Sequence, residues 1–217
     1  MANQTKKRRR ALEVNRRLAL EFPGDAKALC ALSFTTPFQL LCATILSAQC
    51  TDVRVNAVVP NLFEKYPTPD LLAQAMQEDV EEIVRSTGFY HSKAKHLIEM
   101  AQQLISNYGG EVPTAREDLI TLSGVGRKTA NVVRSVAFDL PGLPVDTHVG
   151  RLSRRLGLTI QKDPVKVEKE LGEELPADEW GGFSLRLILH GRAVCDARKP
   201  RCSECDLADL CPKIGVK

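Results

Sequence analysis

Aromatic side chains are scarce in this sequence of 217 residues, since phenylalanine, tyrosine and tryptophan together make up only 5%. Runs of β-branched residues are also short. Aromatic and β-branched side chains are the ones enriched in strands, so a chain poor in both is expected to be mainly helical. Apolar residues still make up 43% of the chain, which is enough for a substantial core.

Long apolar runs are absent too, and none approaches the roughly 18 residues that a membrane span requires. The N-terminus is basic, but Glu13, Asn15, Arg16 and Arg17 interrupt any apolar core of a signal peptide. We therefore expect a soluble intracellular protein.

The net charge is only +3, so composition alone does not require a nucleic-acid partner. The charge is nevertheless uneven, because residues 6–10 (KKRRR) form a basic run that Arg16 and Arg17 follow. Such a run is typical of a solvated tail or helix face, and it is equally consistent with an additional contact to DNA.

A disulfide framework is not expected, because the seven cysteines are odd in number and no signal peptide is evident. Three of them, Cys30, Cys42 and Cys50, lie in apolar helical stretches, where a buried thiol without a special role is the ordinary expectation. The other four lie within 17 residues near the end of the chain: Cys195, Cys202, Cys205 and Cys211.

Four thiolates this close together can hold a structural zinc ion or an iron–sulfur cluster. Zinc sites usually combine two tight pairs, whereas only Cys202 and Cys205 form a tight pair here. A [4Fe-4S] cluster is larger than one ion and tolerates wider spacing, so the pattern favours the cluster over zinc and over free thiols. The spacing also differs from the common ferredoxin run.

Helices are predicted from apolar spacing and from the capping residues at their ends. Thr36-Pro37 and Thr51-Asp52 begin two of them, Ser92 precedes a third, and Gly109-Gly110 ends that third helix. Thr114 with Glu117 is interpreted as a capping box before the next helix. Further helices are expected at 127–138, 164–175 and 179–194, and the segment 141–144 is the best candidate for a domain boundary.

Between two of these helices lies a glycine-rich turn, Gly124-Val125-Gly126. Two glycines one residue apart allow a tight hairpin with positive φ, which exposes backbone N–H groups at the start of the following helix. This arrangement suits a phosphate anion, although an ordinary glycine-rich helix turn has the same pattern.

Lys128 lies just inside the following helix, where a cation is electrostatically disfavoured. It is interpreted as a phosphate-binding lysine or, more specifically, as a nucleophile, for which burial and the positive end of the helix would favour the neutral amine. Asp146 is expected to cap a helix, and its carboxylate is also suited to stabilising a cationic sugar or accepting a proton. Arg151, Arg154 and Arg155 follow on one side of that helix and are expected to meet phosphates.

Taken together, residues 122–131 (LSGVGRKTAN), 145–148 (VDTH), 46–49 (LSAQ) and the cysteine spacing resemble the endonuclease III family. The resemblance runs from about residue 11 to Cys211. It implies an all-α fold in which a helical barrel domain carries a helix–hairpin–helix motif and a smaller helical domain holds a [4Fe-4S] cluster. The implied domains are 30–140, with the motif at about 115–138, and 141–217, packed with an N-terminal segment, 1–29.

The resemblance also implies roles for individual residues. Lys128 matches the Schiff-base lysine and Asp146 its acid partner, while Cys195, Cys202, Cys205 and Cys211 match the cluster ligands. The implied DNA contacts are Gln49, Phe89, Gly124, Val125, Gly126, Arg127, Thr129 and Arg151. Gln49 matches the residue that fills the gap left by the flipped nucleotide, and Phe89 stands where the family often has a leucine wedge. The larger ring of Phe89 and the cysteine at position 50, where alanine is common, depart from the family pattern.

The implied activity is base-excision repair of double-stranded DNA. The enzyme would remove oxidised pyrimidines and cleave abasic sites by β-elimination, as a monomer, in the cytoplasm and at the nucleoid of a prokaryote-type cell. Three alternatives are a monofunctional adenine-type glycosylase, a non-catalytic module that binds damage, and an electron-transfer protein. The presence of Lys128 argues against the first, the presence of both Lys128 and Asp146 against the second, and the cluster spacing and helical bulk against the third.

Overall fold

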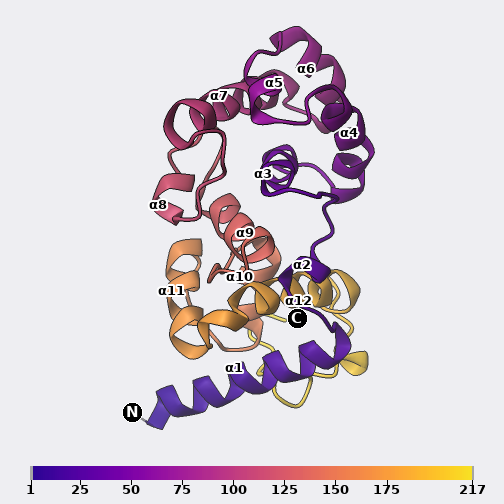
Figure 1. The fold of residues 1–217 in the computed structure, drawn as a ribbon. Helices are drawn as coiled ribbons and strands as arrows, with labels where there is room; N and C mark the ends of the chain where they lie inside the picture. Colours follow the sequence, from indigo (N-terminus) through magenta and orange to yellow (C-terminus); the bar gives the residue numbers. More distant parts are fainter. Residues whose placement is uncertain (1, 217) are drawn as a thin grey trace. The chain divides into compact units, whose positions relative to one another are not determined.

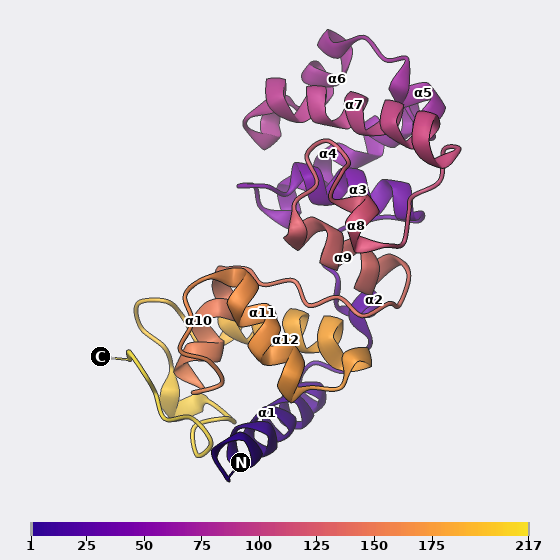
Figure 2. The ribbon, with the colours of Figure 1, turned by 90° about the vertical axis from the view of Figure 1, so that its left-hand side faces the viewer.

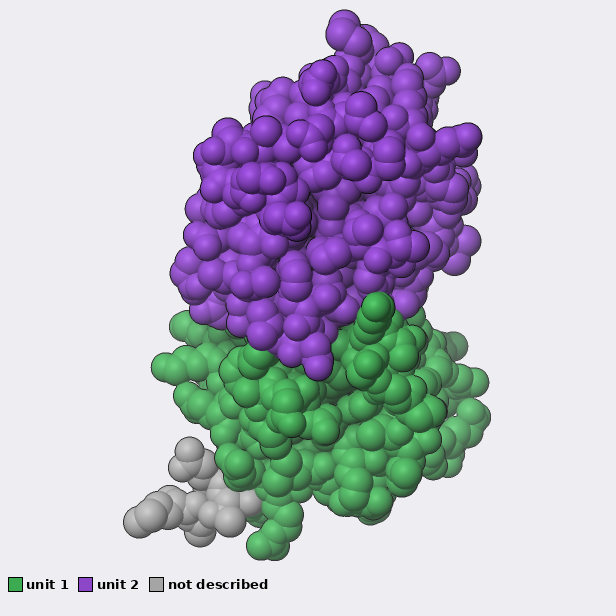
Figure 3. Space-filling view, viewed as in Figure 1, with its two compact units in different colours: residues 1–29, 141–217 green, residues 30–140 purple. Residues whose placement is uncertain are grey.

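The structure is a computed structural model that describes residues 2–216, with side chains from Lys6 onward. All regular elements in this range are helical (Figures 1 and 2), so the all-α fold class expected from the sequence is confirmed. None of the described helices is both long and apolar enough to cross a membrane. The chain divides into two compact units, residues 30–140 and residues 1–29 with 141–217, which Figure 3 distinguishes by colour.

Residues 30–140 form a helical unit built around one central helix. Its elements are α3 (Pro37–Leu46), α4 (Asp52–Lys65), α5 (Pro69–Ala73), α6 (Gln77–Val84), η1 (Arg85–Thr87), α7 (Tyr90–Tyr108), α8 (Arg116–Leu119) and α9 (Arg127–Ala137). Every residue from Leu40 to Leu46 is buried, and α3 packs against α4, α7 and α9. A helix that is apolar on all sides belongs in the middle of a core, and Figure 1 shows the other helices arranged around α3.

Several predicted helix boundaries in this unit are confirmed. The Thr36 side chain accepts a hydrogen bond from the backbone of Gln39, and Pro37 is the first residue of α3. Thr51 caps α4 in the same way. Gly109, with a φ of 62°, ends α7 in the left-handed conformation that glycine adopts without strain.

Two predicted boundaries are wrong. Helix α7 begins at Tyr90 and therefore includes Ser92, because the left-handed turn at Phe89 already starts the helix. The capping box at Thr114 does not form, since α8 begins after Ala115 without any side-chain cap. The Thr114 carbonyl instead accepts a hydrogen bond from the Arg134 side chain of α9, a tertiary contact that local sequence does not reveal.

The other unit joins the two ends of the chain. Its elements are α1 (Ala2–Glu21), α2 (Ala26–Leu29), α10 (Thr147–Arg155), α11 (Pro164–Glu174), η2 (Ala177–Glu179), α12 (Trp180–Ala193) and η3 (Cys202–Glu204). Helix α12 packs against α1, α2 and α10, and its buried Phe183 and Leu187 side chains are part of the core of this unit. The segment after α12 contains the four clustered cysteines and runs past the end of α10.

The basic run at 6–10 takes part in the packing of this unit. The Lys7 ammonium lies 3.4 Å from the carboxylate of the buried Glu174 on α11. Arg10 donates a hydrogen bond to the Leu156 carbonyl at 3.2 Å. Part of the run therefore ties α1 to its neighbours, a role that neither interpretation of the sequence included.

Candidate DNA-repair site

The glycine-rich turn before α9 has the geometry of an anion site. Gly124 has a φ of +75°, in the left-handed region that favours glycine. Gly126 is the N-cap of α9 and makes no side-chain cap bond, and the first turn contains no acidic residue. The backbone N–H groups of a helix N-terminus and the positive end of its dipole both favour an anion at this end of α9.

Lys128 is the second residue of α9, and its side chain is exposed. The burial expected for it is wrong, because the buried face of α9 begins only at Ala130. Arg127 beside it is exposed and Thr129 is half-buried, whereas the Val125 side chain points into the core of the unit. The hairpin therefore offers its backbone, and Lys128 offers a reachable amine beside it.

The two residues predicted to enter the DNA both lie on strained turns of this unit. Gln49 has a φ of 53° and Phe89 a φ of 51°, and only four non-glycine residues in the described chain have a positive φ. Such a conformation costs roughly 1–3 kcal/mol and is characteristic of functional turns. Both side chains are exposed, the Phe89 ring to 66%.

A buried lysine, Lys93, supports the turn at Phe89, and no sequence pattern points to it. The Lys93 ammonium donates a hydrogen bond to the Thr87 carbonyl at 2.8 Å, and the side chain is only 4% exposed. Burial lowers the pKa of Lys93. The Lys93 side chain thus holds the backbone of the turn that precedes the Phe89 ring.

Asp146 lies in the other unit, at the N-terminus of α10, and both of its carboxylate oxygens are engaged. One accepts a hydrogen bond from the backbone N–H of Val149 at 2.8 Å, so the predicted N-cap is confirmed. The other lies 3.2 Å from Nδ1 of His148. The carboxylate stays 19% exposed and is therefore held in a fixed orientation while remaining within reach of a ligand.

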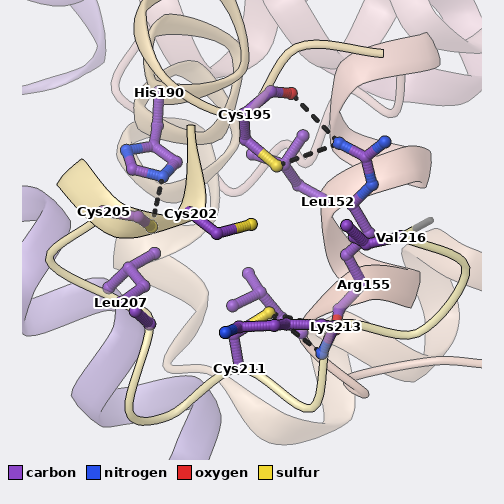
Figure 4. Close-up of a pocket in the computed structure, with 12 residues that line it drawn as sticks. Leu152, Arg155, His190, Cys195, Cys202, Cys205, Leu207, Cys211, Lys213 and Val216 are labelled. Atoms are coloured by element: carbon purple, nitrogen blue, oxygen red, sulfur yellow. Dashed lines mark hydrogen bonds between the residues drawn. The ribbon is translucent and has the colours of Figure 1, made fainter. Parts of the chain in front are cut away.

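The four clustered cysteines line one cavity, together with Leu152, Arg155, His190 and Leu207 (Figure 4). The cavity encloses about 380 Å³ of space, part of it open to solvent. Within the described residues, no three His, Cys, Asp or Glu side chains are arranged to hold a single metal ion.

Three of the four sulfur atoms lie within hydrogen-bond distance of nitrogen donors. Nη1 of Arg155 lies 3.1 Å from Sγ of Cys195, and Nε2 of His190 lies 3.4 Å from Sγ of Cys205. The backbone N–H of Lys213 donates to Sγ of Cys211 at 3.4 Å. Donors around sulfur atoms are typical of iron–sulfur sites, where they tune the bound cluster.

Burial raises the pKa of the Cys205 and Cys211 thiols, and the neighbouring cysteines add to the effect. Cys205 and Cys211 are therefore poorly placed to ionise by themselves. A bound cation of high charge removes that obstacle. The donor set, the spacing and the cavity thus fit a [4Fe-4S] cluster.

Arg155 does not face solvent as the expected phosphate contact requires. Its side chain is 6% exposed, and it donates hydrogen bonds to the carbonyls of Cys195, Asp196 and Ala197. The prediction is wrong for Arg155 because its guanidinium satisfies backbone acceptors that the cysteine segment cannot satisfy itself.

The guanidinium of Arg151 lies partly buried beside α12. It donates to the carbonyls of Gly191 and Cys195, at 3.2 and 3.0 Å. Burial and the nearby Arg155 lower the pKa of Arg151. A contact between Arg151 and DNA stays a prediction.

The chain is similar to known proteins over most of its length. The HhH-GPD superfamily of base excision DNA repair proteins matches residues 42–177, which is more than half of the chain. This protein belongs to that superfamily. Endonuclease III of Synechocystis is 51% identical over 95% of this chain and 93% of its own length, and that of Escherichia coli is 43% identical over 83% and 85%.

Solved structures agree with this assignment. A non-covalent endonuclease III–DNA complex has a TM-score of 0.88 and 43% identity, covering 95% of both chains. A trapped endonuclease III–DNA covalent intermediate also has a TM-score of 0.88, at 44% identity over 95% of this chain and 96% of the other. The expected resemblance is confirmed, and the chain is a base-excision repair enzyme of the DNA glycosylase and AP lyase class.

The site of this HhH-GPD protein includes one pair of residues that the sequence did not indicate. His190 is 2% exposed, and its Nδ1 lies 3.0 Å from the Glu21 carboxylate while its other ring nitrogen faces Cys205. A histidine five residues before the first clustered cysteine was the available signal. Its partner on α1 is 169 residues away in sequence, so only the fold reveals the pair.

The three scattered cysteines differ in environment. Cys42 is fully buried, as expected, whereas Cys30 and Cys50 are half-buried. Burial raises the pKa of the Cys42 thiol strongly and that of the Cys30 thiol less. No disulfide links the cysteines of the described chain.

Proposed function

We propose that Lys128 is the Schiff-base nucleophile of this enzyme and that Asp146 assists it. The observation that supports this most strongly is the exposed amine of Lys128 directly behind a hairpin built to bind an anion. A phosphate held by the hairpin brings the neighbouring deoxyribose to the amine, and positioning of this kind lowers the barrier of a bimolecular step. The relative described as a trapped covalent intermediate with DNA is consistent with an amine nucleophile.

The proposed substrate is double-stranded DNA that carries an oxidised or ring-saturated pyrimidine, or an abasic site. Gln49 and Phe89 fill the space that the flipped nucleotide leaves, and the Phe89 ring replaces part of the lost stacking. Backbone groups of Gly124, Val125 and Gly126 contact phosphate. Arg127, Thr129 and Arg151 are the remaining proposed contacts.

The reaction follows from these positions. The neutral Lys128 amine attacks C1′ of the sugar, and the base leaves with the electron pair of the glycosidic bond. The lysine nitrogen, now bonded to C1′, loses a proton; the bond between C1′ and the ring oxygen then breaks as that oxygen takes up a proton, and a protonated Schiff base between nitrogen and C1′ remains. Removal of a C2′ proton then expels the 3′ phosphate and breaks the strand. The Asp146 carboxylate stabilises the cationic sugar in the first step.

The unit of residues 30–140 is the proposed helical barrel domain, and residues 1–29 with 141–217 are the proposed cluster domain. Cys195, Cys202, Cys205 and Cys211 would hold a [4Fe-4S] cluster. When bound, the cluster would tie the C-terminal segment together and supply a redox-active group. Since the relatives named above are bacterial, we place the enzyme in the cytoplasm, at the nucleoid.

Borohydride trapping on duplex DNA containing thymine glycol tests this proposal, with Lys128→Gln as the matched variant. We expect the wild type to be trapped covalently and the variant to bind without being trapped. A wild type that binds the lesion but is never trapped would overturn the role of Lys128. Elemental analysis decides the cofactor, since iron with acid-labile sulfide supports the cluster and zinc contradicts it.

A further inference from the structure

Three side chains of α7 converge on Ser123, the residue directly before the hairpin glycine. The Ser123 hydroxyl donates a hydrogen bond to the Glu99 carboxylate at 2.7 Å. Nδ1 of His96 lies 2.9 Å from the same hydroxyl oxygen, and the backbone N–H of Ser123 donates to the Gln103 side chain at 2.7 Å. The hydroxyl and the backbone N–H of Ser123 are therefore both bound by side chains of α7.

The directions of these bonds follow from the chemistry of the groups. A carboxylate only accepts, so the single hydroxyl proton of Ser123 goes to Glu99. The hydroxyl oxygen is then an acceptor, which makes Nδ1 of His96 the donor. Bonds of this kind to a charged group are stronger than bonds between neutral groups. The network thus fixes the Ser123 side chain in one orientation.

The backbone of the hairpin packs on the same helix. A Cβ atom at Gly124 would lie only 2.9 Å from Cβ of His96, so no other side chain fits between the hairpin and α7 without a shift. Gly124 also has the positive φ that forms the turn. The packing of Gly124 and the hydrogen bonds of Ser123 hold the turn at two successive residues.

Helix α7 carries a second proposed DNA contact, Phe89, at its N-terminal end. Its N-cap is Phe89, on the strained turn described above. Helix α7 has 19 residues and packs against α3, α5 and α6, which makes it a rigid support (Figure 2). One helix therefore positions both the Phe89 ring and the phosphate-binding hairpin of the unit 30–140.

We propose that Ser123, held by Glu99, His96 and Gln103, is a positioning residue that sets the affinity of the hairpin for the DNA backbone. This inference rests on the proposed function of the hairpin as a phosphate site. Without the Ser123 hydroxyl, the hydrogen bonds to Glu99 and from His96 are both lost. The turn is then free to move before phosphate binds. The conformational entropy that the turn loses when it binds phosphate would then weaken the binding of DNA.

The variants Ser123→Ala and Ser123→Thr test the proposal in the intact, cluster-containing protein. Affinity is measured on duplex DNA with a non-cleavable abasic-site analogue, and the cleavage rate is measured at saturating thymine-glycol DNA. We expect Ser123→Ala to bind about tenfold more weakly, a difference of about 1.4 kcal/mol, with a saturated rate within about twofold of wild type. Ser123→Thr keeps the hydroxyl and is expected to restore binding.

Ser106→Ala is the matched control, because Ser106 lies on the same helix but is exposed and bonds only to carbonyls of that helix. Wild-type affinity in Ser123→Ala would overturn the proposal. So would a parallel fall of affinity, saturated rate and thermal stability that Ser123→Thr does not rescue, because that result indicates a purely structural residue. Binding to the uncleavable analogue does not require the Lys128 chemistry, so a failure of the nucleophile assignment would appear separately, as a wild type that cannot be trapped.

Discussion

Arg155 on α10 donates a hydrogen bond to the sulfur of Cys195 at 3.1 Å, and the same guanidinium reaches three backbone carbonyls of the cysteine segment. Because α10 begins at Asp146, one short helix connects the proposed acid to the proposed cluster ligands. The orientation of Asp146 and the integrity of the cysteine segment are therefore linked through this helix.

Replacement of Arg155 by alanine is expected to destabilise the cysteine segment. It removes the donor to the carbonyls of Asp196 and Ala197 and to the sulfur of Cys195, and a hydrogen bond of this kind contributes about 0.5–1.5 kcal/mol. We expect a lower melting temperature and faster bleaching of the visible absorbance of the cluster under a chelator. Arg154→Ala is the control, because Arg154 makes only one bond, to the Gln161 carbonyl at 3.3 Å. Equal bleaching of the two variants would contradict the role of Arg155.

The cap and the chemistry of Asp146 can be separated by two substitutions. Asparagine caps a helix about as well as aspartate, so Asp146→Asn should keep the melting temperature while losing most of the trapped covalent product. Asp146→Ala should lose both, with a cap worth roughly 0.5–2 kcal/mol. Thermal unfolding and borohydride trapping on the same samples measure the two effects. Full trapping by Asp146→Asn would show that the carboxylate serves only as a cap.

Burial of the Cys42 thiol predicts a specific pH dependence. The folded-state pKa is raised above the unfolded value of 9.0, so the folded protein keeps a proton that the unfolded chain loses. The stabilising effect is complete below pH 9 and is lost as the pH rises through the folded pKa. We expect urea midpoints to fall above pH 9, and to fall less in Cys42→Ala. An equal alkaline loss in both proteins would assign the effect to other groups.

The sequence was sufficient for those features that depend on near neighbours. Caps such as Thr36, the glycine end of α7 and the N-cap at Asp146 use residues at most five positions apart, and all three were predicted correctly. The order of the motifs also led to the right family. Local patterns carry this much because a helix end is satisfied by its own flanking residues.

The features that were predicted wrongly or missed depend on tertiary contacts. The orientation of Arg155 follows from carbonyls about 40 residues later, and that of His190 from a carboxylate 169 residues earlier. Lys128 was expected to be buried because its environment was inferred from its proposed chemistry. The two wrong predictions and the missed pair at His190 all concern which face of a helix is covered, and that is decided by tertiary packing.

The strained turn at Phe89 predicts an opposition between stability and activity. Glycine adopts a φ of 51° without the steric cost that phenylalanine meets, which is roughly 1–3 kcal/mol, and the exposed ring contributes little packing. We therefore expect Phe89→Gly to melt at the same temperature as the wild type or higher. The same substitution removes the group that replaces lost stacking, so excision of thymine glycol should fall about tenfold or more, in line with a few kcal/mol for unstacking a base. Phe89→Leu keeps an apolar wedge and should retain most of the activity, whereas a fully active Phe89→Gly would show that the turn is strained for another reason.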